Sequence, residues 1–363
     1  MATSFDIAVL GGDGIGPEVC DQAVRLIEEI APRLDQVEFN LSHHSVGVGE
    51  YQRSGNALPD ATFEACRSAD AVLLGAMGLP NVRYPNGKEI APQLDLRERL
   101  QLYGGVRPIR LFNAADTPLK GYDVGDIDFV LLRESTEGLF SGRDSVADLD
   151  ADESTNLMRI SRRATDRLCR MAFEIARKRG GDKRVVLFDK ANVLSSMVYM
   201  RHIFDVVAAE YPECQAVPGY VDASALFMVQ RPETFDVVVT ENMFGDILSD
   251  LAAGLVGGMG MAPSGDIGDD AAVFQPSHGS APDIAGKGIA NPVAMILSAA
   301  MMLDWFGHRE TRRAAEAIRL AVEAVFADPE SRTRDMGGKM STAEMTDAIS
   351  SELSTKLAAA GAT

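Results

Sequence analysis

Short apolar runs alternate with longer amphipathic stretches in the N-terminal part of the chain. The runs Ile7–Leu10, Val37–Ser42 and Ala71–Leu74 have the composition of buried strands. Between them, Cys20–Ile30 and Ala61–Ser68 have the spacing of amphipathic helices. This alternation predicts a parallel sheet covered by helices.

The same pattern continues through the rest of the chain. Further strands are predicted at Phe129–Leu132, Val185–Phe188 and Val237–Thr240. Further helices are predicted at Ala91–Tyr103, Ile160–Arg179, Val198–Glu210, Ala223–Gln230, Pro292–Phe306 and Arg312–Phe326. The helix Pro292–Phe306 is apolar on all sides, which predicts that it is buried. We therefore expect an α/β protein.

Length and charge limit the possible partners. The 363 residues give room for about two domains. The formal net charge of −18 argues against nucleic acids and anionic membranes as partners. An anionic small-molecule substrate must then be held by a local cluster of arginine or lysine side chains.

Cysteine usage and hydropathy indicate the compartment. The four cysteines are scattered and form no Cys-x-x-Cys pair, which predicts neither a disulfide framework nor a zinc site and suits the reducing cytoplasm. The N-terminus shows no signal-peptide pattern. No apolar stretch reaches the length of a transmembrane helix.

Asp246 and Asp250 are the first candidates for chemistry. They lie four residues apart in a helix predicted after the strand Val237–Thr240, so both carboxylates project from one face. Like charges at this spacing repel weakly, and their hard oxygens suit Mg²⁺ or Mn²⁺. Two solvated aspartates near a helix N-terminus explain the pair more simply when it is taken alone.

Three arginines and a lysine lie near the ends of predicted elements. Arg97 lies in a predicted helix, Arg107 just beyond it, and Arg133 at the end of a strand. Such an arrangement is typical of a convergent carboxylate site, although surface ion pairing explains each arginine singly. Lys190 follows a strand at a sheet edge, where clefts form, but a solvated lysine also fits. Asp222 is either a helix N-cap or a third carboxylate for the metal.

A glycine-rich loop, GGDGIGPEV, follows the first strand and opens a helix. Its bare backbone amides suit an anion or a nucleotide. The spacing does not fit G-x-G-x-x-G, and Pro17 follows directly, so a plain strand-to-helix turn is an equally good explanation.

Several segments, taken in order along the chain, carry a family resemblance. They are Gly11–Val19, Arg97 with Arg107, Arg133–Gly138, Asp189–Leu194, Tyr220–Asp222, Glu241–Gly260 and His278–Pro292. Together they resemble the β-decarboxylating dehydrogenases, which include the isopropylmalate, isocitrate, homoisocitrate, D-malate and tartrate dehydrogenases. The most specific blocks are ENMFGDILSDLAAGLVGGMGMAPS and HGSAPDIAGKGIANP, and the resemblance covers nearly the whole chain.

The resemblance implies an isopropylmalate dehydrogenase-like α/β fold of two domains, with a mixed sheet covered by helices, that is not a Rossmann fold. Residues 1–103 with 256–363 would form the first, cofactor-binding domain. Residues 104–255 would form the second domain, which binds substrate and metal and makes the dimer. The cleft between the domains would hold the site, and a homodimer would share its active sites between subunits.

The resemblance also implies a role for each candidate residue. Asp246 and Asp250, with Asp222 of the other subunit, would bind Mg²⁺ or Mn²⁺. Arg97, Arg107 and Arg133 would hold the carboxylates of a malate-like substrate. Lys190, also from the other subunit, and Asp222 would be the catalytic acid and base groups.

The implied reaction is oxidation of a (2R)-hydroxy diacid at its hydroxyl carbon, followed by loss of CO₂. Asp283 lies where NAD-dependent members accept the adenosine ribose hydroxyls, and its carboxylate would repel a 2′-phosphate. We therefore expect NAD as cofactor. His278, Gly279 and Asn291 would be further contacts on the adenosine side.

Two positions depart from the family pattern. Phe140 stands where most members have a tyrosine that assists the late protonation, so oxidation without efficient decarboxylation is an alternative. Gln93 and Leu94 stand where isopropylmalate enzymes offer two apolar residues. Oxidative decarboxylation of 3-isopropylmalate is the first hypothesis, with tartrate or D-malate as alternative substrates.

Overall fold

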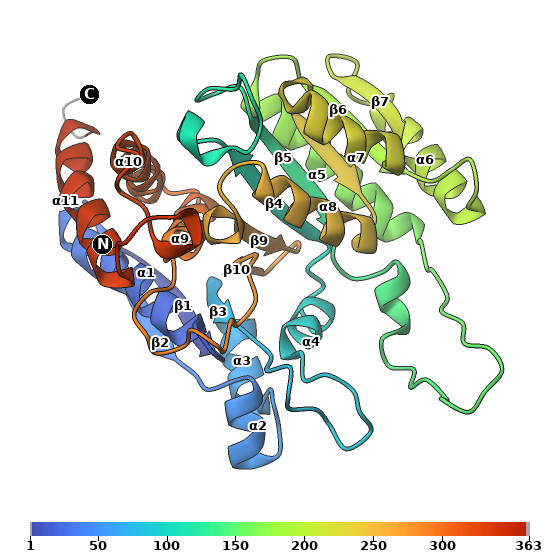
Figure 1. The fold of residues 1–363 in the computed structure, drawn as a ribbon, viewed down its shortest axis with the longest axis horizontal. Helices are drawn as coiled ribbons and strands as arrows, with labels where there is room; N and C mark the ends of the chain where they lie inside the picture. Colours follow the sequence, from blue (N-terminus) through green and yellow to red (C-terminus); the bar gives the residue numbers. More distant parts are fainter. Residues whose placement is uncertain (1, 361–363) are drawn as a thin grey trace. The chain divides into compact units, whose positions relative to one another are not determined.

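The computed structural model describes residues 2–360, and the chain divides into two compact units. Unit 1 comprises Met1–Leu100, Gly257–Gly265 and Asp269–Thr363. Unit 2 comprises Gln101–Val256 and Asp266–Gly268. Figure 1 shows the helices and strands of both units.

The sheet of unit 1 is built on the N-terminal strand. Its strands follow the spatial order β2 (Val37–His43), β1 (Thr3–Gly12), β3 (Ala71–Ala76), β10 (Ala272–Pro276) and β9 (Pro263–Ile267). Strand β1 pairs in parallel with β2 and β3, and β10 pairs in parallel with β3. This confirms the parallel sheet that the alternating N-terminal pattern predicts.

Unit 1 also contains several helices. They are α1 (Gly16–Ile30), α2 (Val48–Ser54), α3 (Asp60–Ser68), α4 (Pro92–Arg99), α9 (Val293–Trp305), α10 (Arg309–Phe326) and α11 (Thr342–Ala360). Helix α9 packs against α1, α10 and β10 and is buried along almost its whole length. The prediction of a buried apolar helix is therefore confirmed.

Unit 2 contains a mixed sheet. Its strands follow the order β4 (Gly104–Arg110), β5 (Asp128–Glu134), β8 (Val237–Thr240), β6 (Arg184–Asp189) and β7 (Gln215–Tyr220). Strand β4 is antiparallel to β5, whereas the β5–β8, β8–β6 and β6–β7 pairs are parallel. One antiparallel edge strand on a parallel sheet is a common arrangement in α/β proteins.

Alternate residues of the central strands of unit 2 face opposite cores. Val237 and Val239 pack in the core that includes α5 (Arg162–Arg179) and α6 (Ser195–Ala208). Val238 packs in the core that includes α7 (Val221–Gln230) and α8 (Asn242–Gly254). This period of two explains why the run is continuously apolar, since both faces of the strand are covered.

One prediction of local structure is wrong, and one of two alternatives is excluded. The predicted helix Ala91–Tyr103 ends at Arg99, because Gln101 takes a positive φ of 56° and the chain turns into β4. Asp222 is not an N-cap, since α7 begins at Val221 and its N-cap is Tyr220. Strands β4 and β9 and helix α2 have too few apolar positions in sequence to stand out as elements.

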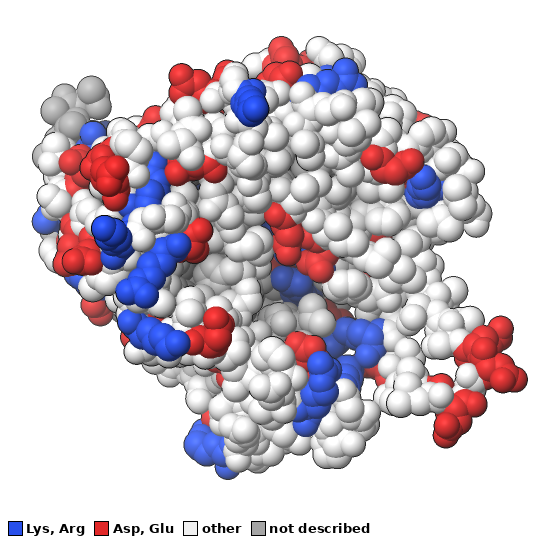
Figure 2. Space-filling view, in the orientation of Figure 1, with Lys and Arg blue, Asp and Glu red and all other residues white. Residues whose placement is uncertain are grey.

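The acidic segment Asp144–Glu153 is exposed, as its composition suggests. It belongs to the connection that projects between η3 (Leu139–Gly142) and α5, where Figure 2 shows a cluster of acidic side chains. Within residues 2–360, no helix has the length and apolar character needed to cross a membrane.

Candidate active site

The turn from β8 into α8 is the scaffold of the site in unit 2. Glu241 directly follows the strand and caps the helix, accepting hydrogen bonds from the amides of Met243 at 3.1 Å and Phe244 at 2.7 Å. A carboxylate at this place also interacts favourably with the helix dipole. Burial nevertheless raises the pKa of Glu241, and the two amide bonds oppose that shift.

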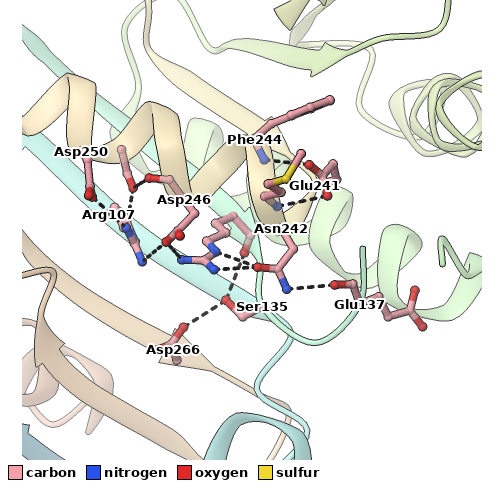
Figure 3. Close-up of polar contacts among 12 residues, drawn as sticks. Arg107, Ser135, Glu137, Glu241, Asn242, Phe244, Asp246, Asp250 and Asp266 are labelled. Carbon is pink, nitrogen blue, oxygen red and sulfur yellow. Dashed lines mark hydrogen bonds and ion pairs between the residues drawn. The ribbon is translucent and has the colours of Figure 1, made fainter. Parts of the chain in front are cut away.

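Asn242 and Asp246, in the first turns of α8 (Figure 3), both contact Arg133 at the end of β5. Its Nε and Nη2 donate to Asn242 Oδ1 at 2.9 and 2.7 Å, and its Nη1 pairs with Asp246 Oδ1. The Arg133 side chain is only 3% exposed, whereas that of Asp246 is 44% exposed. The buried Arg133 side chain therefore holds the Asp246 carboxylate where it is partly exposed to solvent.

Asn242 links this cation to the next loop. Its Nδ2 donates to the backbone carbonyl of Glu137 at 2.9 Å, while its Oδ1 accepts from Arg133. Both the nitrogen and the oxygen of the Asn242 amide are therefore hydrogen-bonded. These bonds fix the plane of the Arg133 guanidinium relative to the loop after β5. Asn242 is not among the site residues predicted from sequence, because nothing in its local sequence indicates either hydrogen bond.

Arg107, in the middle of β4, meets the other end of the same helix face. Its Nη1 donates to Ser249 Oγ and lies 3.8 Å from Asp250 Oδ1, while its Nη2 lies 3.9 Å from Asp246 Oδ1. The Arg107 side chain is 6% exposed and that of Asp250 is 58% exposed. Two buried arginines thus face two partly exposed aspartates.

The two aspartates suit a divalent cation. Burial raises the pKa of Asp250, Arg107 lowers it, and Asp246 raises it further, so a cation at this place would relieve the repulsion between the carboxylates. Their oxygens have the hardness that Mg²⁺ and Mn²⁺ prefer. Residues 2–360 nevertheless contain no cluster of three or more His, Cys, Asp or Glu side chains with metal-site geometry.

Lys190 and Asp222 form a separate pair. Lys190 follows β6, Asp222 lies in the first turn of α7, and Lys190 Nζ lies 2.7 Å from Asp222 Oδ1. This hydrogen bond is the main reason that the pKa of Asp222 is lowered. The preceding Asp189 is fully buried and bound by Arg201 through two contacts of 2.7 Å, which fixes the backbone that carries Lys190.

Phe140 lies beneath Arg133. The Arg133 Cζ atom is 5.2 Å from the centre of the Phe140 ring, within the range of a cation–π contact. The residue at this position therefore supports a buried guanidinium and supplies no proton.

Because residue 245 is a glycine, α8 can approach Arg133 closely. A larger side chain at this position should therefore destabilise the protein. A Cβ atom at Gly245 would lie 2.7 Å from both Cβ and Cγ of Arg133. We expect Gly245→Ala to lower the free energy of unfolding by about 1–3 kcal/mol through overpacking, measured by urea denaturation. Gly254 lies in the same helix, and a Cβ there meets nothing within 4 Å. Gly254→Ala should therefore be neutral or stabilising, and equal losses in the two variants would contradict this explanation.

Glu134 predicts a pH dependence of stability. Burial raises its pKa from 4.5 to about 7, against hydrogen bonds from Thr136 and from the Glu137 amide. Folding therefore favours the protonated acid. Between about pH 4.5 and about pH 7, the unfolded chain releases this proton while the folded protein keeps it, so the free energy of unfolding falls by up to about 3 kcal/mol as the pH rises through this range.

Urea denaturation at several pH values tests this expectation. Glu134→Gln should make the fall in stability between pH 4.5 and 7 shallower than in the wild type, whatever its effect on absolute stability. A variant with the wild-type slope would show that Glu134 does not titrate in this window.

The remaining predicted site residues belong to unit 1. Arg97 is buried on α4. Gly279 and Asp283 are exposed in the loop after β10. His278 Nδ1 contacts the carbonyl of Gly279 at 2.9 Å, and burial lowers the pKa of His278. Asn291 uses its side chain internally, binding the amide of Val293 at 3.1 Å and Asp335 at 3.2 Å.

The glycine-rich loop packs against the loop that contains the predicted cofactor residues. The Ile15 amide donates to the Ser280 carbonyl at 2.8 Å, and a Cβ at Gly14 would collide with the same carbonyl. The amides of Asp13 and Gly16 also donate to backbone carbonyls. Close packing therefore accounts for these glycines, and the loop resembles a plain turn more than a phosphate cradle.

Comparisons with known proteins agree on one family. Residues 6–349 match the isocitrate/isopropylmalate dehydrogenase family. The 3-isopropylmalate dehydrogenase of Archaeoglobus fulgidus is 41% identical over 351 residues, covering 96% of this chain and 99% of that protein. The 3-isopropylmalate/3-methylmalate dehydrogenase of Methanocaldococcus jannaschii is 40% identical, covering 94% of this chain and 97% of that protein.

Solved structures agree with the sequence relatives. Isocitrate dehydrogenase from Methylococcus capsulatus superposes with a TM-score of 0.85 and 38% identity, covering 96% of this chain and 99% of that one. A β-decarboxylating dehydrogenase from Thermococcus kodakarensis gives a TM-score of 0.80 at 35% identity, covering 97% and 96% of the two chains. The expected fold is therefore confirmed.

Proposed function

The chain belongs to the isocitrate/isopropylmalate dehydrogenase family, and from this premise we propose that it is an NAD- and Mg²⁺- or Mn²⁺-dependent enzyme that oxidises and decarboxylates a (2R)-malate-type hydroxy diacid. The observation that carries the proposal is the pairing of two buried arginines, Arg107 and Arg133, with two partly exposed aspartates on one face of α8. The arginines supply positive charge for the carboxylates of a diacid, and the aspartates supply negative charge for the metal that the diacid chelates.

The arginines bind the substrate carboxylates. Arg107 and Arg133 are held in place by Ser249 and Asn242, so their guanidinium groups lose little freedom when a carboxylate takes over from the aspartates. We propose Arg97 of α4 as the third arginine that binds a substrate carboxylate. Because all three are buried, each has a weaker competing interaction with water than a surface arginine has.

Lys190 and Asp222 move the protons. The pair is close enough, at 2.7 Å, for one group to pass a proton to the other. Together they take the proton of the substrate hydroxyl as its carbon is oxidised, and they return a proton after CO₂ has left.

The metal and the cofactor would supply the rest of the chemistry. A divalent metal held by Asp246 and Asp250 of one subunit and Asp222 of the other would polarise the substrate oxygens, and NAD would accept the hydride. We propose that His278, Gly279, Asp283 and Asn291 form the cofactor-binding residues. Asp283 is exposed, as a carboxylate that receives ribose hydroxyls must be.

We propose a cytoplasmic homodimer with shared active sites. Helices α7 and α8 of unit 2 present the exposed apolar side chains Leu226, Val229 and Ile247. Burying such a surface against a second copy is favourable. The absence of a three-carboxylate cluster within residues 2–360 also suits a metal site completed by another chain. We therefore assign cofactor binding to residues 1–103 with 256–363, and substrate binding, metal binding and dimerisation to 104–255.

The named relatives favour 3-isopropylmalate as the first substrate to test, with D-malate and tartrate as alternatives. Phe140 supports a second candidate function, which is oxidation without decarboxylation, because a phenyl ring against Arg133 has no proton to give.

The deciding experiment is the ratio of CO₂ released to NADH formed. It should be measured with Mn²⁺ and NAD on 3-isopropylmalate, D-malate, both tartrate isomers and isocitrate. We expect a ratio of one on at least one substrate and no turnover with EDTA. NADH without CO₂ would support the second candidate, and no NADH from any of the substrates would contradict both.

A further inference from the structure

A single buried carboxylate joins three segments of unit 1. Asp13, in the glycine-rich loop after β1, is only 5% exposed. Its Oδ2 atom accepts hydrogen bonds from the amides of Val48 and Gly78, each at 2.9 Å, and its Oδ1 atom accepts one from the amide of Gly49 at 3.0 Å. Gly78 follows β3, and Val48 and Gly49 begin α2, the first helix after β2. Asp13 therefore ties together the segments that follow three neighbouring strands.

These segments lie at one edge of the sheet. Strand β1 pairs in parallel with β2 and β3, and β10 pairs in parallel with β3, so the carboxyl ends of all four strands are at the same edge. In open parallel sheets, ligands bind at this edge. A carboxylate is costly to bury unless several donors bind it, and its hydrogen bonds are stronger than those between neutral groups. Asp13 thus holds these segments more firmly than neutral backbone contacts would.

Gly78 connects Asp13 to the loop after β10. The Gly78 amide binds Asp13, and the Gly78 carbonyl accepts a hydrogen bond from the hydroxyl of Ser280, which is buried. The Ser280 carbonyl in turn accepts a hydrogen bond from the amide of Ile15 at 2.8 Å. The path therefore runs from Asp13 through Gly78 to Ser280 and returns to the loop that contains Asp13.

We infer that Asp13 is a positioning residue for the cofactor, which fixes the backbone of residues 278–283 through Gly78 and Ser280. This inference rests on the proposed function, which assigns residues of this segment to NAD binding. A loop that is already held in its binding conformation loses little conformational entropy when the ligand arrives, and this raises the affinity. Loss of the Asp13 carboxylate should therefore weaken cofactor binding, although the carboxylate is buried and its partners are backbone amides.

Binding of NADH to Asp13→Ala and Ser280→Ala tests the inference. Affinity is measured by fluorescence titration, at a temperature at which circular dichroism shows both variants to be folded. We expect Asp13→Ala to weaken NADH binding by roughly 5- to 30-fold and Ser280→Ala by roughly 3- to 10-fold. In turnover, the KM for NAD should rise by similar factors, while kcat at saturating NAD stays within about twofold of the wild type. Mn²⁺ affinity should not change, since the proposed metal ligands belong to unit 2.

The double variant tests whether Asp13 acts through Ser280. If both residues act on the same loop by way of Gly78, their effects are not independent. The double variant should then lose less NADH affinity than the product of the two single losses. A loss equal to that product would show that the two residues act separately, and it would overturn the inference.

Thr62→Val is the matched control. The buried Thr62 hydroxyl, in α3, donates to the Ser45 carbonyl at 3.0 Å, just before α2. This hydrogen bond lies outside the path from Asp13 to Ser280. The substitution should lower Tm, as the loss of a buried hydrogen bond does, and leave NADH affinity unchanged.

The possible outcomes separate the two proposals. Wild-type NADH affinity in Asp13→Ala or Ser280→Ala, or an equal loss of affinity in Thr62→Val, overturns the inference and leaves the proposed function intact. If Asp13→Ala does not fold, the NADH affinity of Ser280→Ala decides alone. No NADH binding by the wild type overturns the proposed cofactor, and the inference with it.

Discussion

Replacing Asp246 with asparagine is expected to lower kcat/KM by roughly 10³-fold and to weaken Mn²⁺ binding by at least about 100-fold. Asp246 contacts both buried arginines, since Arg133 pairs with it and the Arg107 Nη2 atom lies 3.9 Å from its Oδ1 atom. The substitution keeps the shape of the side chain and removes its charge. Asp250 is then the remaining carboxylate on this face of α8, and the metal loses one negatively charged oxygen ligand.

Two measurements separate metal binding from structural damage. Titration of the protein with Mn²⁺, followed by electron paramagnetic resonance, reports affinity without turnover, and urea denaturation without metal reports stability. Asp205→Asn, which removes an exposed carboxylate from α6, is the matched control and should change neither quantity. Wild-type Mn²⁺ affinity in Asp246→Asn would contradict the assignment of the metal site.

Replacing Lys190 with methionine is expected to lower kcat by roughly 10²- to 10⁴-fold, the usual contribution of a positioned acid or base. The variant should retain most of its Mn²⁺ affinity, because Lys190 is not itself a proposed ligand and its partner Asp222 keeps its carboxylate, as do Asp246 and Asp250. It should also change the pH profile of kcat, since the group that takes the hydroxyl proton is missing. The pKa of Asp222 should rise toward its ordinary value, because the Lys190 hydrogen bond is what lowers it.

Lys178→Met serves as the control, since Lys178 is exposed on α5 and its loss should leave kcat unchanged. A Lys190→Met enzyme with wild-type kcat and pH profile would show that the proton moves by another route.

Mixing the two inactive variants tests whether sites are shared. If Lys190 serves the site that contains Asp246 of the partner subunit, a mixed dimer of Asp246→Asn and Lys190→Met has one site with both defects and one with neither. Random pairing would then restore about one quarter of wild-type activity. No recovery in dimers shown to contain both variants would place all the catalytic residues of a site in one subunit.

Local features of this protein can be predicted from sequence, because they depend on residues close together in the chain. The apolar runs predict β1, β3, β5, β6 and β8, and the interval of four residues places Asp246 and Asp250 on one face of α8. The position of Lys190 after a strand follows from the same kind of pattern. These features rest on side-chain periodicity and helix geometry, which need no knowledge of the remainder of the fold.

The pairings that make the site were decided by tertiary structure. Arg133 and Asp246 are 113 residues apart, and they meet because β5 lies beside β8 in the sheet. Asn242 is bound to Arg133 and to the Glu137 carbonyl for the same reason, and nothing in its local sequence indicates either bond. Lys190 and Asp222 meet because β6 pairs with β7, which leads into α7. The order of the strands sets these contacts, and strand order depends on how the whole chain buries its apolar faces.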